Sequence, residues 1–515
     1  MTLFTKFCFT RRFSDLTAIK YSASQSQNFL QIPNYARKQL YHSRSRYLSL
    51  GRKFHKLTRQ VTTYSVHPEK IWFKPDLPPN SKNAQELVDG NDLVPSLENE
   101  MCWVIPKKLD PQRFQTALQK TLVLFPTFAG RLRKSDNGYQ ISYNSQGLPV
   151  QFAQVDVVGH PAAKGTEAIT SQDICTMAQF MDINPFTSLA LEDDTPLVTM
   201  RLTYLTKTDQ TVIGLSFSQI AADGPTVKLF IHTLSQFYQG LELSNQPKYF
   251  MRKWAAEGSK NTNTSINRPV TSSVTHKELV QQLWGNDTEG CSLLQIIFTP
   301  EEVRGLMKRI HQEINNPRVS VQHATVAYVV NLYNSFVNDP ITIVRFILTY
   351  RSRETDDSSR YRDMDNVGNG IYLLDVPVAN LPGLGDKAGA FRKAIINSRE
   401  PHNLEALISA RSSLGFEMMQ NGQIMPWSAP GTTLVNGLHH LDFAEAGSFG
   451  CPGRAQIYYS TCYSRYLTLT KANPILLADG TWKRNESDVG VAIPVPRDVK
   501  EKMLEQKARD MQGLL

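Results

Sequence analysis

Strand and helix patterns alternate along the chain from about residue 65, and a polar stretch interrupts this alternation once, near the middle. Residues 240–285 lose the periodicity and are rich in Asn, Ser, Thr and Lys, a composition typical of a connection between folding units. A chain of 515 residues is also large enough for more than one hydrophobic core. We therefore expect an α/β protein with an N-terminal domain at 61–255, a crossover linker at 256–285 and a C-terminal domain at 286–515.

Short-range signals predict individual elements within both halves. Asp110 and Pro111 form a typical helix start, because Asp can cap free amides and Pro tolerates the first helical position. The apolar runs Leu197–Leu205 and Thr211–Phe217 predict an antiparallel hairpin, which leads into a helix beginning near Pro225. The remaining elements are expected as strands at Leu293–Phe298, Ile341–Tyr350, Ile371–Val378, Gln456–Cys462 and Val489–Val495, and as helices after the capping pattern Thr299-Pro300-Glu301-Glu302, near Ser320–Phe336 and from Arg497.

The first 60 residues differ in composition from the rest of the chain. They hold 12 Lys or Arg, seven Ser and a single acidic residue, Asp15, whereas the remainder holds 44 basic and 46 acidic residues. An Arg-rich, acid-poor leader is typical of a mitochondrial transit peptide, so we expect mitochondrial import, with a disordered extension on a cytoplasmic protein as the alternative. Because the body is close to neutral, the net charge of +9 gives no support for a nucleic-acid partner.

Two further features of the sequence limit the class of protein. Its apolar runs stop well short of the roughly 18 residues that a transmembrane helix needs, so we expect no transmembrane segment. The six cysteines stand far apart, and none lies with His or another Cys at a spacing typical of zinc ligands. We therefore expect no metal ion and no disulfide framework.

The most informative motif follows the predicted hairpin. Its second strand ends in Gln219-Ile220-Ala221-Ala222-Asp223-Gly224 directly before a helix, and this run resembles the HxxxDG motif of the BAHD acyltransferases within the chloramphenicol-acetyltransferase-like superfamily. Three other blocks are similar to blocks of that family in the same order: Phe125–Leu132, Tyr350–Arg353 followed by Gly368-Asn369-Gly370, and Asp442-Phe443. Four ordered blocks across roughly 65–510 make the resemblance specific.

The resemblance implies a fold and an activity. The fold would consist of two domains, each a mixed sheet packed with helices, with an active-site tunnel between them. The activity would be transfer of an acyl group, with acetyl as the default, from acyl-CoA to a hydroxyl or amine of a small-molecule acceptor. Acyl-CoA would act as a co-substrate with no other cofactor bound, and the protein would be a monomer.

The resemblance also implies roles for individual residues. Gln219 and Asp223 would mark the catalytic centre, with Asp223 paired to an arginine, and Gly224 would permit the tight strand-to-helix turn. Arg351 and Asp442 would form an ion pair between two segments of the second domain, although each charge could instead be an ordinary solvated one. Thr432 and Thr433 are substrate-binding candidates by position, as donors to the oxyanion of the tetrahedral intermediate.

Two departures from the family pattern bear on catalysis. Gln219 stands where the family has the histidine that acts as general base, and an amide cannot accept a proton near neutral pH, which removes a rate factor of about 10² to 10⁴. The family's DFGWG motif reads Asp442-Phe443-Ala444-Glu445-Ala446-Gly447 here, and the family's preceding Trp is replaced within Thr432-Thr433-Leu434. Candidate substitutes for the missing base are His440 (from the pair His439-His440) and Glu445, and Cys451 is a candidate for a thiol intermediate. The alternative for His440 is an ordinary satisfied or solvent-facing histidine beside a strand end.

These departures leave three functions open. The chain is an acyltransferase in which Gln219 holds a substrate hydroxyl in place without removing its proton. It is alternatively an inactive member of the family that binds an acyl-CoA or a partner as a scaffold. A third possibility is a cyclisation or condensation in which the substrate supplies its own base.

Overall fold

The computed structural model describes most of the part of the chain that carries the four motif blocks, and Ser352 and Arg353 of the third block lie outside the described residues. Among the segments outside them are most of the leader and most of the predicted linker. The described residues are 58–66, 84–87, 98–135, 138–143, 147–156, 171–173, 180–181, 195–244, 247–249, 274–275, 290–314, 319–351, 366–420, 423–424, 430–461, 465–484 and 487–513.

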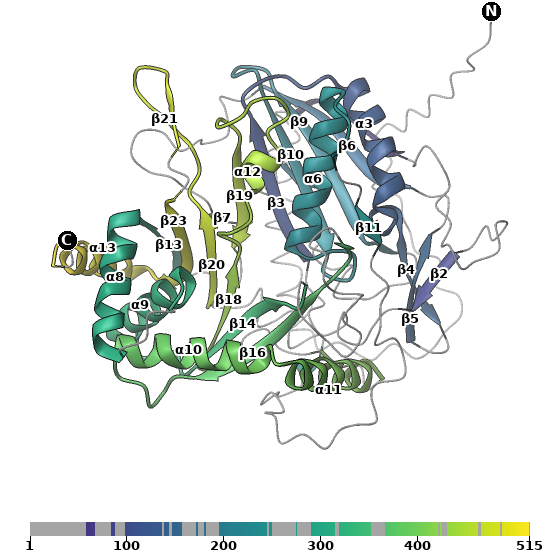
Figure 1. Ribbon diagram of the computed structural model, residues 1–515. Coiled ribbons are helices and arrows are strands. Elements are labelled where there is room, and N and C mark those ends of the chain that lie inside the picture. The colour runs from purple at the N-terminus through teal and green to yellow at the C-terminus, as the bar shows by residue number, and fades with distance from the viewer. Residues whose placement is uncertain are drawn as a thin grey trace, which may run out of the picture. The chain divides into compact units, whose positions relative to one another are not determined.

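A seven-stranded mixed sheet organises the first half of the chain (Figure 1). Helices α3 (Pro111–Leu124) and α6 (Gly224–Gln239) pack against each other and bury their apolar faces in one core with this sheet. The strand order is β1 (Thr58–Val66), β6 (Leu148–Val155), β9 (Val198–Leu205), β10 (Gln210–Ser218), β3 (Glu98–Ile105), β19 (Gln456–Thr461) and β7 (Ser171–Asp173). A smaller sheet has the order β2 (Ala84–Leu87), β5 (Gly138–Tyr143), β4 (Arg131–Ser135) and β8 (Thr195–Pro196), with the 3₁₀ helix η2 (Pro126–Ala129) before β4.

A six-stranded mixed sheet organises the second half. Its order is β13 (Cys291–Phe298), β23 (Val489–Pro496), β20 (Tyr466–Lys471), β18 (Thr432–Gly437), β14 (Ile343–Thr349) and β16 (Ile371–Pro377). The helices of this half are α8 (Pro300–Ile314), α9 (Val321–Phe336), α10 (Leu384–Ser398), α11 (Pro401–Gln420) and α13 (Arg497–Gln512). Short elements complete the described chain: β11 (Lys248–Tyr249) with β15 (Asn366–Val367), β12 (Val274–Thr275) with β17 (Gln423–Ile424), β21 (Ile475–Leu476) with β22 (Trp482–Lys483), and α12 (Phe443–Ala446).

The first sheet takes one strand from the far end of the sequence. Strand β19 pairs antiparallel with β3, so that Ile457 lies opposite Trp103, and residues 441–459 contribute side chains to the first core. The division at 256–285 therefore does not separate the two sheets, although most of that segment lies outside the described residues. Strand β1 also begins at Thr58, three residues inside the segment that composition assigns to the leader.

The local signals in the sequence act as expected. The Asp110 carboxylate accepts a hydrogen bond from the Arg113 amide at 2.7 Å and caps α3. Strands β9 and β10 form the predicted antiparallel hairpin. At the start of α8, the Thr299 amide donates to the Glu302 carboxylate at 2.9 Å, and the Glu302 amide donates to the Thr299 hydroxyl at 3.3 Å, as in a capping box. Within the described residues, no helix combines the length and the apolar character that crossing a membrane requires.

Candidate active site

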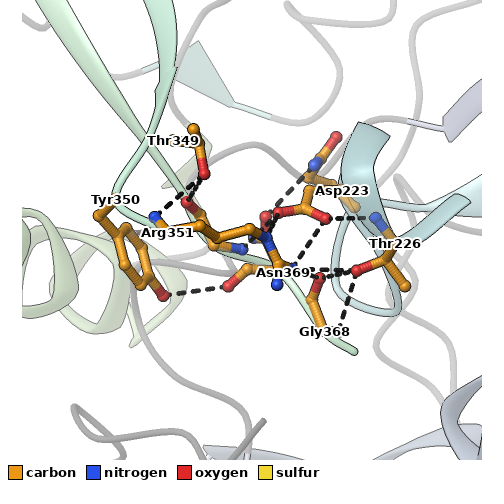
Figure 2. Close-up of polar contacts among 9 residues, drawn as sticks. Asp223, Thr226, Thr349, Tyr350, Arg351, Gly368 and Asn369 are labelled. Carbon is orange, nitrogen blue, oxygen red and sulfur yellow. Dashed lines mark hydrogen bonds and ion pairs between the residues drawn. The ribbon is translucent and has the colours of Figure 1, made fainter. Parts of the chain in front are cut away.

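The aspartate of the Gln219–Gly224 run forms a buried ion pair with an arginine of the second half. Arg351 donates from Nε and Nη2 to the two carboxylate oxygens of Asp223, each at 2.9 Å, and the two side chains are 1% and 0% exposed (Figure 2). Asp223 also accepts from the Thr226 amide at 3.0 Å, as the N-cap of α6, and from the Gly370 amide at 2.8 Å. The arginine that the resemblance predicts as the partner of Asp223 is therefore Arg351.

The same cluster holds the turn between β15 and β16. Arg351 donates to the Gly368 carbonyl at 2.7 Å, and the Thr226 hydroxyl exchanges hydrogen bonds with the Gly368 backbone at 2.6 and 3.0 Å (Figure 2). A Cβ on Gly370 would lie 3.0 Å from Arg351 Nε, so the close approach favours glycine there. The cluster fixes the start of α6 against this turn, and with it the loop that carries Gln219.

The predicted ion pair between Arg351 and Asp442 is wrong. Asp442 instead caps α12 and binds Lys471, at 2.9 Å, and Arg484, which contacts both of its carboxylate oxygens. Burial opposes ionisation of this group, but the hydrogen bonds from Lys471 and Arg484 outweigh it and lower the pKa of Asp442. The Arg351 guanidinium does not pair with Asp442, because it donates to Asp223, Thr226 and Gly368 instead.

Gln219 lies directly after β10 and its side-chain amide is held at both ends. Its Oε1 accepts from Asn99 Nδ2 on β3 at 3.0 Å, and its Nε2 donates to Oδ1 of the buried Asn369 at 3.3 Å. Asn369 belongs to the turn that the Asp223 cluster holds, and its carbonyl accepts from the Tyr350 hydroxyl at 3.0 Å (Figure 2). Gln219 thus joins the two halves of the chain through a chain of three amides.

A cavity of about 100 Å³ lies at Gln219. One wall comes from β3, β10 and the first turn of α6, including Asn99, Phe217 and Pro225. The opposite wall comes from strands β14, β16, β18 and β20 of the second sheet, including Ile347 and Thr468. The volume is below the roughly 300 Å³ at which typical ligand pockets begin, so it suits a small reacting group better than a whole substrate.

The candidate substrate-binding threonines lie at the other end of β18. Thr432 and Thr433 are buried at its start, and the Thr433 hydroxyl donates to the Arg465 carbonyl at 2.8 Å. The residues that β18 brings to the cavity are Asn436 and Gly437 at its end. Asn436 lies about 13 Å beyond Thr432 at strand spacing, and its amide donates to the Tyr466 hydroxyl at 2.8 Å. The structure therefore does not bring Thr432 and Thr433 to the cavity.

The candidate substitute bases occupy three different environments. His440 follows β18 in a turn and lines the cavity together with Gln219. Glu445 is bound to Arg484 at 3.2 Å and accepts from the Gly453 amide at 3.1 Å, outside this cavity. Cys451 is 2% exposed within the first hydrophobic core, which removes its sulfur from the proposed chemistry.

A second cavity, of about 530 Å³, adjoins the first. Pro225 and Leu441 line both cavities, so the first turn of α6 and the chain after His440 separate them. Lys228 and His232 of α6 line the second cavity on one side, with Asp442 and Glu445 on the other. Its volume lies within the range of typical small-molecule sites.

No cluster of three or more His, Cys, Asp or Glu side chains with metal-binding geometry occurs among the residues that the structure describes.

Sequence reasoning missed three asparagines of this site. In the sequence, Asn369 lies in a block that indicates only a glycine-rich turn, and Asn99 and Asn436 lie in no recognised motif. The available signal is positional: Asn436 is a polar residue ending the run Thr432–Val435, and polar side chains at strand ends often face a site. Nothing local in the sequence relates Asn99 to Gln219, which is 120 positions away.

Sequence comparisons agree with the motifs over part of the chain. A family model described as the Transferase family matches residues 86–329. Taxadien-5-alpha-ol O-acetyltransferase of Taxus chinensis is 30% identical over 148 residues, which cover 27% of this chain and 30% of that protein. The match thus spans less than a third of this curated relative.

Structural comparisons extend the likeness to both halves. Vinorine synthase is similar with a TM-score of 0.59 at 16% identity, covering 86% of this chain and 96% of that one. TRI101 of F. graminearum, in a complex with ethyl coenzyme A, is similar with a TM-score of 0.57 at 11% identity, covering 82% and 97%. The predicted fold of two chloramphenicol-acetyltransferase-like domains is confirmed. The family model and this fold agree with the resemblance of the ordered sequence blocks to the BAHD-type acyltransferases.

Proposed function

We propose that the protein transfers an acyl group from acyl-CoA to a hydroxyl or amine of a small-molecule acceptor, and that acetyl is the first acyl group to test. The observation that carries this proposal is the position of Gln219. Its loop is fixed by the buried Asp223–Arg351 pair and opens on a cavity walled by both sheets. A transfer reaction needs two substrates to meet at such a place, with their reacting atoms held in a defined geometry.

Gln219 supplies hydrogen bonds to this reaction. Because Asn99 and Asn369 hold its amide at both ends, its orientation is set before substrate binds. A primary amide carries two N–H donors, and Asn369 accepts from only one of them. The second is available to the thioester oxygen, where negative charge develops as the acceptor attacks; such a donor typically contributes about 10² to 10³ in rate.

The acyl donor would reach the reaction centre through the larger cavity. Its volume of about 530 Å³ suits part of a coenzyme, and the adjoining cavity of about 100 Å³ suits the acyl group itself. Lys228 supplies a positive charge at the lining of the larger cavity. The carboxylate of Asp442 on the opposite side is already matched by Lys471 and Arg484, which reduces its repulsion of phosphate groups.

The test is a transfer assay with the full chain. Acetyl-CoA and longer acyl-CoAs are incubated with a panel of small alcohols and amines, and free thiol and acylated product are both measured. Asn436→Phe, which fills the cavity, should lower transfer at least tenfold, whereas Ile396→Ala on the exposed side of α10 should leave it unchanged. Binding of acyl-CoA with no product from any acceptor would favour the scaffold alternative. Product formed without release of coenzyme A would favour the condensation alternative.

Two features that rest on the sequence alone are part of the proposal. We propose mitochondrial import directed by residues 1–60, and a diffuse cytosolic signal from a fluorescent reporter fused to these residues would contradict it. We also propose a monomer, which light scattering on the purified chain would test.

A further inference from the structure

We propose that His440 is the general base of the acyl transfer, in place of the motif histidine that this chain lacks. This inference rests on the proposed function, because it names the residue that takes the acceptor's proton. The starting point is chemical. Gln219 can orient an acceptor and stabilise an oxyanion, but its amide has no proton affinity near neutral pH.

The described lining of the Gln219 cavity contains four titratable side chains. The Glu100 side chain lies on the face of β3 that carries Cys102 and Val104. Asn99, which contacts Gln219, lies on the opposite face, so the Glu100 carboxylate is directed away from Gln219. Burial raises the pKa of Tyr459 well above its ordinary value, and the Tyr466 hydroxyl accepts from Asn436. This leaves the imidazole of His440, whose ordinary pKa lies close to neutrality.

The turn that carries His440 is held in place against the second half of the chain. The Leu438 amide donates to the Leu469 carbonyl at 2.7 Å, and the Leu441 amide donates to the Leu438 carbonyl at 2.9 Å. A Cβ on Gly437 would lie 2.7 Å from the Gln322 side chain, so the turn packs closely on α9. His440 is exposed to solvent as well as lining the cavity, which provides a route by which its proton can exchange with water.

The charges around His440 favour the neutral ring. Partial desolvation, followed by the positive charge of Lys228 on α6, lowers the pKa of His440, and an interaction with the Gly437 backbone opposes this only in part. The His439 ring lies edge-on at 5.7 Å between centroids, and its own pKa is lowered to about 4, so it adds no charge at neutral pH. Among the described residues, the cavity lining also carries the ionisable side chains of Glu100, Tyr459 and Tyr466. Asp442, two positions after His440, is bound to Lys471 and Arg484.

The proton and electron changes balance with this one base. As the acceptor oxygen or nitrogen forms a bond to the thioester carbon, His440 removes its proton and becomes an imidazolium. Collapse of the tetrahedral intermediate breaks the carbon–sulfur bond, and the imidazolium returns the proton to the coenzyme A thiolate. The ring is then neutral again, and acylated acceptor and free coenzyme A are the products.

The experiment compares His440→Gln with His439→Gln in the transfer assay. His439 is the matched control, since it is the adjacent residue of the same turn and does not line the cavity. We expect His440→Gln to lower kcat/KM by about 10² to 10⁴ and His439→Gln to change it less than threefold. Far-UV circular dichroism and the melting temperature verify that both variants are folded.

Two further measurements separate a base from a merely structural residue. The acidic limb of the pH profile of kcat/KM should be present in the wild type and in His439→Gln, and absent in His440→Gln. Adding Gln219→His to the His440→Gln variant restores a histidine in the motif and should raise kcat/KM at least tenfold above that of His440→Gln alone.

Failure of this inference and failure of the proposed function give different results. Transfer by the wild type that is lowered less than threefold in His440→Gln, or that keeps its acidic limb there, would overturn the role of His440 alone. Absence of acyl-CoA-dependent product from the wild type with every acceptor would overturn both. A rate loss that Gln219→His leaves unrepaired would also contradict a role as base.

Discussion

Replacing Arg351 by methionine tests the ion pair on which the geometry of the site depends. Methionine has an apolar side chain of similar length but lacks the guanidinium, so the variant loses both hydrogen bonds to Asp223 and those to Thr226 and Gly368. Removing one partner of a buried pair costs about 3–5 kcal/mol, because the other charge stays buried and uncompensated. Two backbone amides still donate to Asp223 in the variant, so we expect a loss near the lower end, about 3 kcal/mol.

Urea unfolding followed by circular dichroism measures this loss, and a double-mutant cycle with Asp223→Asn isolates the pairwise contribution. We expect the free energy of unfolding lost in the double variant to be about 1–3 kcal/mol smaller than the sum of the losses in the two single variants. Arg309→Met is the control: its pair with Glu313 spans one turn of α8 with both side chains partly exposed, and its loss should cost about 0.3–0.5 kcal/mol. An Arg351→Met loss no larger than that of the control, or additive losses in the cycle, would refute the reasoning.

Two other predictions concern stability. Burial, followed by the charges of Arg392 and Arg399, lowers the pKa of His323 from 6.5 to about 4. Between these two pH values the unfolded chain binds a proton at His323 that the folded chain does not. The contribution to stability that is present above pH 6.5 is therefore lost as the pH falls toward 4. His323→Gln keeps an acceptor for the Ser320 amide and should flatten this pH dependence of the urea midpoint, and an unchanged slope would count against the assignment. Gly447→Ala would place a Cβ 2.5 Å from the Trp103 ring and should lower stability by about 1–3 kcal/mol, as measured by urea unfolding. Gly290→Ala, which meets no atom within 4 Å, is its control, and equal effects of the two substitutions would show that the Trp103 contact is not limiting.

Much of the fold could be predicted because the signals concerned lie within a few residues of each other. Asp110, Thr299 and Glu302 cap helices through bonds that span three positions, so their spacing carries the full information. The hairpin of β9 and β10 is similarly local, since a short turn sets its register. The strands β18 and β20 were not predicted, although both are largely buried, because short apolar runs do not distinguish strand from helix.

The candidate site was predictable only where a motif marked it. Gln219, Asp223 and Gly224 were found because they lie within six residues, and the need of Asp223 for an arginine followed from the resemblance. The sequence does not show whether Asp223 or Asp442 is the partner of Arg351, because both are single acidic residues ahead of a short turn or helix. Burial decided it: Asp223 is fully enclosed and requires a cation, whereas Asp442 is 21% exposed and has Lys471 and Arg484 beside it.

By itself, the sequence determined the resemblance to the BAHD acyltransferases, the two α/β halves and the glutamine at the first position of the HxxxDG-like motif, since each of these depends on contiguous residues. Only the tertiary structure decided which distant side chains meet. It inserted β19 into the first sheet, brought Asn99 and Asn369 to the two ends of the Gln219 amide, and placed His440 rather than Thr432 at the cavity. The physical reason is that these contacts join residues 120 to about 350 positions apart, and their formation depends on how two sheets pack rather than on any local preference.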